Sequence, residues 1–311
     1  MNEQKYTPPE PNISGIHNVG VIPLEILREY IDWTPFFLSW EMRGKYPAIF
    51  ESPAYGDEAR KLFDETNEIL DKIIADGSLT AEAVCGFFPA NSIGNDDIEI
   101  YADETRSQTI FTLNMLRQQT KRGQKLPNLC LADFIAPKES GIRDYIGAFA
   151  VTSGIGTVEI CREYEAKRDD YSAILTKAIA DRLAEAAAEW LHERVRREFW
   201  GYAAAETLSN EDRIAENYRG IRPAPGYPAC PDHTEKKKLF ALLEAQERIR
   251  ITLTENYAMM PAASVSGWYF SHPKSQYFSI GKITREQLAD YARRKSWTDE
   301  EAERWLGANL E

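Results

Sequence analysis

The segment from Arg222 to Lys236, RPAPGYPACPDHTEK, constrains the fold more than any other part of the sequence. It holds four prolines and a glycine and shows neither helical nor strand periodicity. Because proline fixes φ and removes a backbone donor, we expect a rigid, extended loop here. The loop begins with an arginine, and a guanidinium binds a carboxylate through two parallel hydrogen bonds. The segment therefore suits the binding of a small anion, with a plain connector between two helices as the alternative.

Helices and strands are predicted in separate blocks along the chain, not in alternation. The predicted helices cover Asp57–Asp76, Asp170–Trp200, Asn210–Asn217, Glu235–Glu247, Thr284–Lys295 and Thr298–Leu306. The predicted strands are Ile98–Tyr101, Leu129–Ile135 and Ile146–Val151, and Ser264–Gly281 is rich in strand formers but broken by Pro273. This segregation favours the α+β class with an antiparallel sheet over a doubly wound parallel sheet.

Several helix ends carry recognisable signals. Gly77 can end the first helix, and Asp169 or Asp170 can cap the long one. Thr284 and Thr298 can cap the last two helices.

Composition indicates a cytoplasmic module. The chain has 311 residues and 43% apolar residues, without a run long enough to span a membrane, and its first residues lack a signal pattern. Its four cysteines are far apart in sequence, which predicts reduced thiols. The net charge of −12 argues against binding to nucleic acid or to anionic membranes, and weakly favours cationic ligands.

The polar, proline-bearing residues 1–12 are predicted to form a flexible arm or the remnant of a linker. Residues 13–311 show no internal repeat and no low-complexity linker, and we interpret them as one domain.

Other chemistries find little support. The segment Gly154–Glu159 lacks the third glycine of a dinucleotide-binding turn, and Arg196 stands where a zinc-peptidase helix needs its second histidine. We interpret Glu189 and His192 as part of a solvated helix face, and we expect no metal site. His17 is interpreted as an ordinary turn residue.

A series of segments resembles the activation domain of cobalamin-dependent methionine synthase, in the family's order and over nearly the whole chain. Besides the proline-rich segment, the resemblance rests on YIDWTPFF (30–37), GKYP (44–47), FPAN (88–91), DDIEIYADETR (96–106), LRQQ (116–119), CLADFIAPKESG (130–141), DYIGAFAV (144–151), KAIADRLAEAAAEWLHERVRREFWGY (177–202), SVSGWYFSHPKSQYF (264–278) and DYARRKSWTDEEAERWLGANL (290–310).

The resemblance implies a single curved domain around a central twisted antiparallel sheet flanked by helices, and a site for S-adenosylmethionine. By this resemblance Arg222 would bind the ligand's carboxylate and Asp32 its ammonium end. The other implied ligand-binding residues are Glu185, Ala224, Tyr227, Tyr277 and Phe278. From the residues alone, Asp32 could instead cap a helix, Glu185 could be an exposed helix residue, and Tyr277 could belong to the core.

The resemblance also implies a function. The module would supply S-adenosylmethionine as methyl donor for the reductive remethylation of inactive cob(II)alamin, which the cobalamin-binding domain of methionine synthase holds. Flavodoxin or a related flavoprotein reductase would supply the electron. The chain shows no homocysteine, folate or complete cobalamin motif, so we expect it not to run the full methyltransferase reaction alone. The alternative is a sensor or docking module that binds S-adenosylmethionine without transferring methyl.

Overall fold

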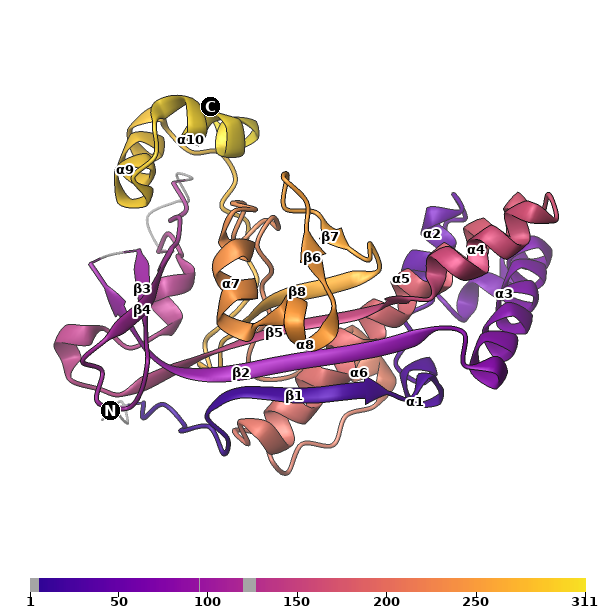
Figure 1. Cartoon of the computed structure of the whole chain (residues 1–311), viewed down its shortest axis with the longest axis horizontal. Helices are drawn as coiled ribbons and strands as arrows, with labels where there is room; N and C mark the ends of the chain where they lie inside the picture. The colour runs from indigo at the N-terminus through magenta and orange to yellow at the C-terminus, as the bar shows by residue number, and fades with distance from the viewer. Residues whose placement is uncertain (1–5, 95, 120–126) are drawn as a thin grey trace.

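A six-stranded antiparallel sheet forms the centre of the computed structural model, which describes residues 6–94, 96–119 and 127–311 (Figure 1). Its strands are β1 (Gly15–Ile22), β2 (Thr80–Ile93), β3 (Asp97–Tyr101), β4 (Thr109–Asn114), β5 (Asp144–Ile155) and β8 (Ser264–Tyr269). The order is β4-β3-β2-β5-β8, and β1 pairs with the first half of β2 while β3 pairs with its last residues. A separate small ribbon joins β6 (Thr252–Leu253) and β7 (Met259–Met260).

Strands β2 and β5 are buried on both faces, which explains their apolar composition. Along β2, Cys85 and Phe87 face one core cluster and Val84 and Ala90 face the other. Successive side chains of a strand point to opposite faces, so a single strand serves both cores. The predicted strands Ile98–Tyr101 and Ile146–Val151 are confirmed as parts of β3 and β5.

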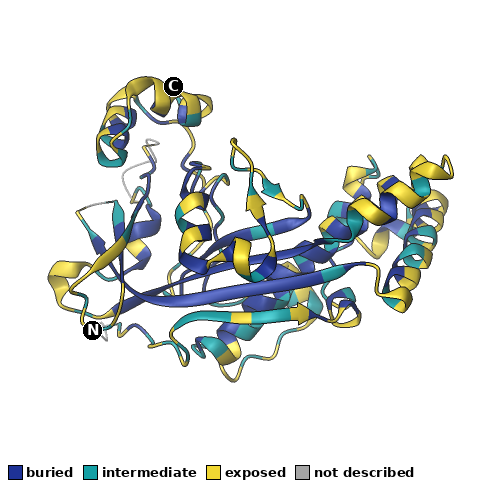
Figure 2. Ribbon diagram, viewed as in Figure 1, coloured by how far each residue is buried: buried dark blue, intermediate teal, exposed yellow. Residues whose placement is uncertain are grey.

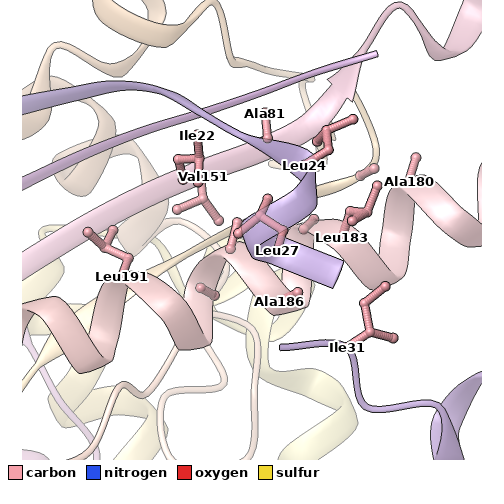
Figure 3. Close-up of a cluster of buried hydrophobic side chains, with 14 of the residues drawn as sticks. Ile22, Leu24, Leu27, Ile31, Ala81, Val151, Ala180, Leu183, Ala186 and Leu191 are labelled. Atoms are coloured by element: carbon pink, nitrogen blue, oxygen red, sulfur yellow. The ribbon is translucent and has the colours of Figure 1, made fainter. Parts of the chain in front are cut away.

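Helices cover both faces of the sheet. They are α1 (Leu24–Arg28), α2 (Thr34–Ser39), α3 (Gly56–Asp76), α4 (Thr157–Ala166), α5 (Asp170–Arg194), α6 (Asn210–Ile214), α7 (Glu235–Leu243), α8 (Ala245–Ile249), α9 (Arg285–Lys295) and α10 (Asp299–Leu306). The long helix α5 packs with α1 and α3 on one face, and α7 and α8 pack on the other. Figure 2 shows β2 and β5 as buried strands between them, whereas β1 is partly exposed, and Figure 3 shows Leu27, Leu183 and Val151 meeting between α1, α5 and β5.

The C-terminal helices α9 and α10 form a third, smaller core of their own. Leu288, Tyr291 and Leu306 are buried there together with Ile280 and Ile283. This pair lies at one end of the molecule, whereas α2, α3 and α4 lie at the other (Figure 1).

The predicted helix signals are confirmed where the helices begin and end. Gly77 adopts the left-handed conformation after α3. The side chain of Asp169 accepts a hydrogen bond from the backbone of Ser172, and Thr284 and Thr298 cap α9 and α10 in the same way.

Three other predicted segments differ from the structure in part. The predicted strand Leu129–Ile135 is a short 3₁₀ helix, because Asp133 and Cys130 form a reciprocal capping pair at its start. The long helix changes to a π-helical turn at Val195, where Trp200 donates to the carbonyl five residues earlier. The segment Ser264–Gly281 is a strand only as far as Tyr269.

The N-terminal arm predicted for residues 1–12 lies partly outside the described residues, since these begin at Tyr6. Within the described part, the carbonyl of Pro9 accepts a hydrogen bond from the indole of Trp200, and Asn12 donates to the carbonyl of Glu198. The flexibility of the arm stays a prediction.

The α+β class and the central antiparallel sheet are confirmed. All four cysteines are buried as free thiols. Over the described residues, none of the helices has the length and apolarity needed to cross a bilayer. His17 lies within β1 with its ring 4.8 Å from that of Phe199, so its interpretation as a turn residue is wrong.

Candidate ligand-binding site

The start of the proline-rich segment is tied to the end of β8 through an isolated β-bridge, and this pairing directs Arg222. Ile221 exchanges backbone hydrogen bonds with Phe270, and the amide of Trp268 donates to the carbonyl of Pro223 at 2.9 Å. Successive side chains of an extended chain point to opposite faces of a sheet, so Arg222 points to the face opposite Ile221, which is the face covered by α5. Its backbone N–H donates to the hydroxyl of Tyr277 at 3.0 Å.

Beyond Arg222 the segment is irregular, as predicted, but it does not stay extended. The amide of Tyr227 donates to the carbonyl of Ala224 at 3.2 Å, and that of Cys230 donates to the carbonyl of Tyr227 at 2.9 Å. Two consecutive tight turns result, and α7 begins only at Glu235. The turns place Tyr227 at the surface with 59% of the residue exposed.

The guanidinium of Arg222 is held from one side by helix α5. Its Nη1 donates to Oε2 of Glu189 at 2.6 Å and to the hydroxyl of Tyr218 at 2.8 Å, and lies 3.4 Å from Nδ1 of His192. Burial opposes the charged form, but Glu189 together with Tyr218, Tyr277 and Tyr269 outweighs burial and raises the pKa of Arg222 well above its ordinary value. The group is therefore charged. Its Nε and Nη2 donate to no residue in the described part of the chain, which leaves one edge of the fork open.

Glu189 and His192 are buried, so their interpretation as a solvated helix face is wrong. The carboxylate of Glu189 and the ring of His192 face Arg222 at the start of the proline-rich segment. This segment is distant from α5 in the sequence but packs against it in the fold. Arginine can only donate hydrogen bonds, so Nδ1 of His192 accepts and the imidazole is neutral. Burial, reinforced by the positive charges of Arg196 and Arg222, lowers the pKa of His192 well below its ordinary value.

A polar hollow of about 310 Å³ opens beside Arg222, between α5, the start of α2 and α6. Its lining residues are mostly charged: Tyr30, Asp32, Pro35, Arg182, Glu185, Ala186, Glu189, Asn210, Arg213, Ile214, Glu216 and Arg222. Four of them are acidic and three are arginines, and an acidic surplus favours a cationic group in the ligand. Burial raises the pKa of both Glu185 and Glu216, and the charge of Arg222 opposes this rise.

Asp32 both lines this hollow and closes a turn. Its Oδ1 accepts a hydrogen bond from the backbone N–H of Thr34 at 2.9 Å, at the start of α2. The N-cap of α2 is Trp33 and has no side-chain hydrogen bond, so Asp32 closes a turn before the helix instead of capping it, and this turn occupies one of its two carboxylate oxygens. Because a carboxylate accepts several hydrogen bonds, this turn leaves Asp32 able to bind an ammonium group.

An apolar hollow of about 410 Å³ adjoins the polar one and shares Arg222 and Glu185 with it. It is lined by Glu185, Arg222, Pro223, Ala224, Tyr227, Pro228, Ala229, Val265, Tyr277 and Phe278. Tyr277 is 40% exposed, so it is not a core residue. Two accessible tyrosine rings beside apolar surface provide the contacts that a planar nucleobase needs.

All seven residues predicted to bind ligand therefore lie around two adjoining hollows. Asp32 lines the polar one, four residues line the apolar one, and Glu185 and Arg222 line both. Sequence reasoning missed the partners of Arg222, in particular Tyr218 and Glu189. One signal was available, because Glu185, Glu189 and His192 are spaced four and three residues apart, on one face of a helix.

Within residues 6–94, 96–119 and 127–311, no group of three or more histidine, cysteine, aspartate or glutamate residues is placed to hold a metal ion. What this site offers is a charged cleft beside an apolar one.

Fold and site together define an α+β module that can bind a small molecule with one charged and one apolar end. The chain belongs to the family of activation domains of vitamin B12-dependent methionine synthases, whose family model matches residues 23–296. It is also similar to a solved structure, the crystal structure of the MetH reactivation domain bound to AdoHcy. The two chains are 55% identical and superpose with a TM-score of 0.95, over 100% of this chain and 94% of the other.

Proposed function

We propose that this chain binds S-adenosylmethionine and supplies its methyl group for the reductive remethylation of cob(II)alamin. The acceptor is held by the cobalamin-binding domain of methionine synthase, and the electron comes from flavodoxin or a related flavoprotein reductase. We place this activity in the cytoplasm. Membership of the activation-domain family supports the proposal, as does the AdoHcy bound to the similar MetH reactivation domain.

One observation carries the proposal: a charged hollow and an apolar hollow adjoin and share Arg222 and Glu185. S-adenosylmethionine has a carboxylate and an ammonium at one end, an adenosine at the other and a sulfonium between them. The open edge of Arg222 suits the carboxylate, and Asp32 suits the ammonium. Ala224, Tyr227, Tyr277 and Phe278 suit the adenosine, and Glu185 at the junction suits the cationic middle of the ligand.

The residues of this chain would position the donor and exclude water from it. The sulfonium is already an activated methyl donor, so the chain need not supply an acid, a base or a nucleophile. During transfer the sulfur–carbon bond breaks with its electron pair remaining on sulfur, and the donor leaves as S-adenosylhomocysteine. Cobalamin in the partner domain would supply the atom that accepts the methyl group.

Calorimetry tests the ligand directly. We expect S-adenosylmethionine and S-adenosylhomocysteine to bind the isolated chain at one site, and adenosine alone to bind more weakly because it lacks the groups that Arg222 and Asp32 recognise. Absence of binding by both full ligands would overturn the proposal.

A second candidate function is a sensor or docking module that binds the same ligand without methyl transfer, since it needs the same pocket. Methyl-labelled S-adenosylmethionine separates the two. The chain is mixed with a cobalamin-binding domain and a reductant, and label is sought on cobalt. Label on cobalt supports remethylation, whereas binding without transfer supports the sensor.

Methyl transfer also requires a surface of this chain on which the cobalamin-binding domain can dock. We propose that the cobalamin domain and the reductant approach the side of the chain on which the two hollows open. Arg294 and Lys295 are poor candidates for steering an acidic reductant, because Arg294 pairs with Asp97 and the side chain of Lys295 is only 6% exposed. The side chain of Arg293 is 74% exposed, but it pairs with Asp290. Basic groups elsewhere on the surface would have to serve that purpose.

A further inference from the structure

The binding fork of Arg222 is fixed by a buried carboxylate on the neighbouring helix. The shortest hydrogen bonds of Nη1 of Arg222 go to Glu189 at 2.6 Å and to Tyr218 at 2.8 Å, and Nδ1 of His192 lies farther away at 3.4 Å. These two bonds set the rotation of the guanidinium plane. Nε and Nη2 lie in the same plane and have no partner in the described part of the chain. Their direction is therefore set by the two bonds of Nη1.

Glu189 is itself held between two cations. Its Oε2 binds Arg222, and its Oε1 lies 3.6 Å from Nη1 of Arg196, whose side chain is fully buried. Arg196 in turn binds Glu206 through Nε at 2.8 Å and stacks over the ring of Tyr218, with 3.9 Å from its guanidinium carbon to the ring centre. The carboxylate therefore has little freedom to move, and it transmits that rigidity to Arg222.

The remaining wall of this cluster is aromatic. His192 stacks on Tyr269 with ring centres 5.1 Å apart and planes 16° from parallel, and it meets the edge of Tyr218 at the same separation. A neutral imidazole adds no charge here. Two arginines and two glutamates therefore balance one another, and the charge of Arg222 is already compensated before a ligand arrives.

We propose that Glu189 is a positioning residue for the ligand's carboxylate, acting through Arg222. Because the charge of Arg222 is already balanced by Glu189, Arg222 attracts an anion mainly through its two free, correctly oriented hydrogen-bond donors. Glu189 therefore contributes to binding by fixing the orientation of those donors. Tyr218 serves the same purpose through its hydroxyl. This inference rests on the proposed function, since it concerns how the same site recognises the amino-acid end of the ligand.

Two ligands separate this role from a general structural one. S-adenosylhomocysteine carries the amino-acid end, and 5′-methylthioadenosine lacks it but keeps the adenosine and the sulfur. If Glu189 acts through Arg222, Glu189→Ala should lower the affinity for S-adenosylhomocysteine about 10- to 100-fold. This is the range expected for loss of a hydrogen bond to a charged group. It should change the affinity for 5′-methylthioadenosine by less than about twofold, because that ligand makes no contact with the fork.

The conservative variant supplies the decisive readout. In Glu189→Gln the amide oxygen can still accept from Nη1, so we expect most of the affinity for S-adenosylhomocysteine to return. Tyr218→Phe, which keeps the ring over Arg196 and removes only the hydroxyl, should lower that affinity by an intermediate amount. Glu206→Ala is the matched control: it unbalances the buried cluster without touching Arg222, and should lower the melting temperature without changing the ratio of the two affinities.

Three results would overturn the inference. Equal losses for both ligands in Glu189→Ala would mean that the site has simply collapsed. A Gln variant as weak as the Ala variant would mean that charge, and not orientation, matters. Should Glu189→Ala not fold, Tyr218→Phe with an unchanged ratio of affinities would reject the inference. A wild-type chain that binds neither full ligand would instead reject the proposed function on which it rests.

Discussion

Lys295 and Arg222 are both held by acidic side chains, but they differ in whether all of their hydrogen-bond donors have partners. Lys295, at the end of α9, donates to Asp232 at 2.7 Å, to Thr234 at 2.8 Å and to Glu235 at 2.5 Å, so its ammonium group is saturated. Arg222 uses one nitrogen for Glu189 and Tyr218 and keeps an open edge beside two hollows. A saturated cation ties elements of the fold together, whereas an unsaturated one is available to a ligand.

Replacing Lys295 should give the largest effect, and the effect should fall on stability. Lys295→Met leaves Asp232 and Glu235 buried without their cation, which should cost about 3–5 kcal/mol of unfolding free energy. Denaturant unfolding measures this. Lys237→Met, at an exposed neighbouring position, is the control and should stay within about 0.5 kcal/mol of wild type. A stable Lys295→Met variant with impaired ligand binding would reverse the comparison.

Replacing Arg222 should come next, and its effect should fall on binding. Arg222→Ala should lower the affinity for S-adenosylmethionine by about 2–4 kcal/mol, as for other charge-assisted pairs broken on one side. Calorimetry measures the loss. Arg219→Ala, three residues earlier in the chain, removes a hydrogen bond to the carbonyl of Ser271 and should leave the affinity intact. Unchanged affinity in Arg222→Ala would show that Arg222 does not bind the carboxylate.

A pair of tyrosines sharpens the contrast at smaller scale. The hydroxyl of Tyr291 donates to Asp232 at 2.7 Å within the saturated network, so Tyr291→Phe should cost about 1–2 kcal/mol of stability and leave binding unchanged. The hydroxyl of Tyr277 accepts from the backbone of Arg222, so Tyr277→Phe should lower affinity by about 0.5–1 kcal/mol with little change in stability. Parallel melting curves and titrations check both; the same phenotype in the two variants would contradict the distinction.

Mild acid should affect binding before it affects the Lys295 network. Burial raises the pKa of Glu185 despite the opposing charge of Arg222, so this carboxylate is neutralised at a higher pH than an ordinary glutamate and stops attracting a cationic ligand. Because the pKa of Glu185 is higher in the folded chain than in the unfolded chain, Glu185 stabilises the fold at pH values below its unfolded pKa. This contribution is lost as the pH rises through the folded pKa.

Asp232 behaves in the opposite way. Burial alone would raise its pKa, but Lys295 and the surrounding hydrogen bonds lower it, so its contribution to stability is lost only as the pH falls through that lowered value. Affinity for S-adenosylmethionine should therefore decline at a higher pH than the melting temperature does. Titrations and melting curves over the same acidic series measure both, with Glu185→Gln as the variant whose affinity should depend less on pH.

Much of the fold could be predicted because its signals are local. Periodicity located α3 and α5, and single residues such as Gly77, Asp169 and Thr298 set where helices begin or end. The strand predicted at Leu129–Ile135 failed because apolar composition does not distinguish a strand from a capped 3₁₀ turn.

The residues of the site also differ in whether local sequence signals predict them. Arg222 and its loop could be identified from the sequence, because a proline-rich segment with a leading arginine is unusual. Burial of Glu189 and His192 could not, because it depends on a loop that folds against α5 from about 30 residues further along the chain.

The pairing of Ile221 and Pro223 with the outer edge of β8 has a consequence beyond recognition of a ligand. The amide of Trp268 in β8 and the backbone of Phe270 just after it are occupied by the loop that carries Arg222, and an exposed strand edge invites pairing between molecules. Ligand recognition and protection against self-association thus share one short stretch of backbone. Changes that loosen this stretch should lower solubility as well as affinity.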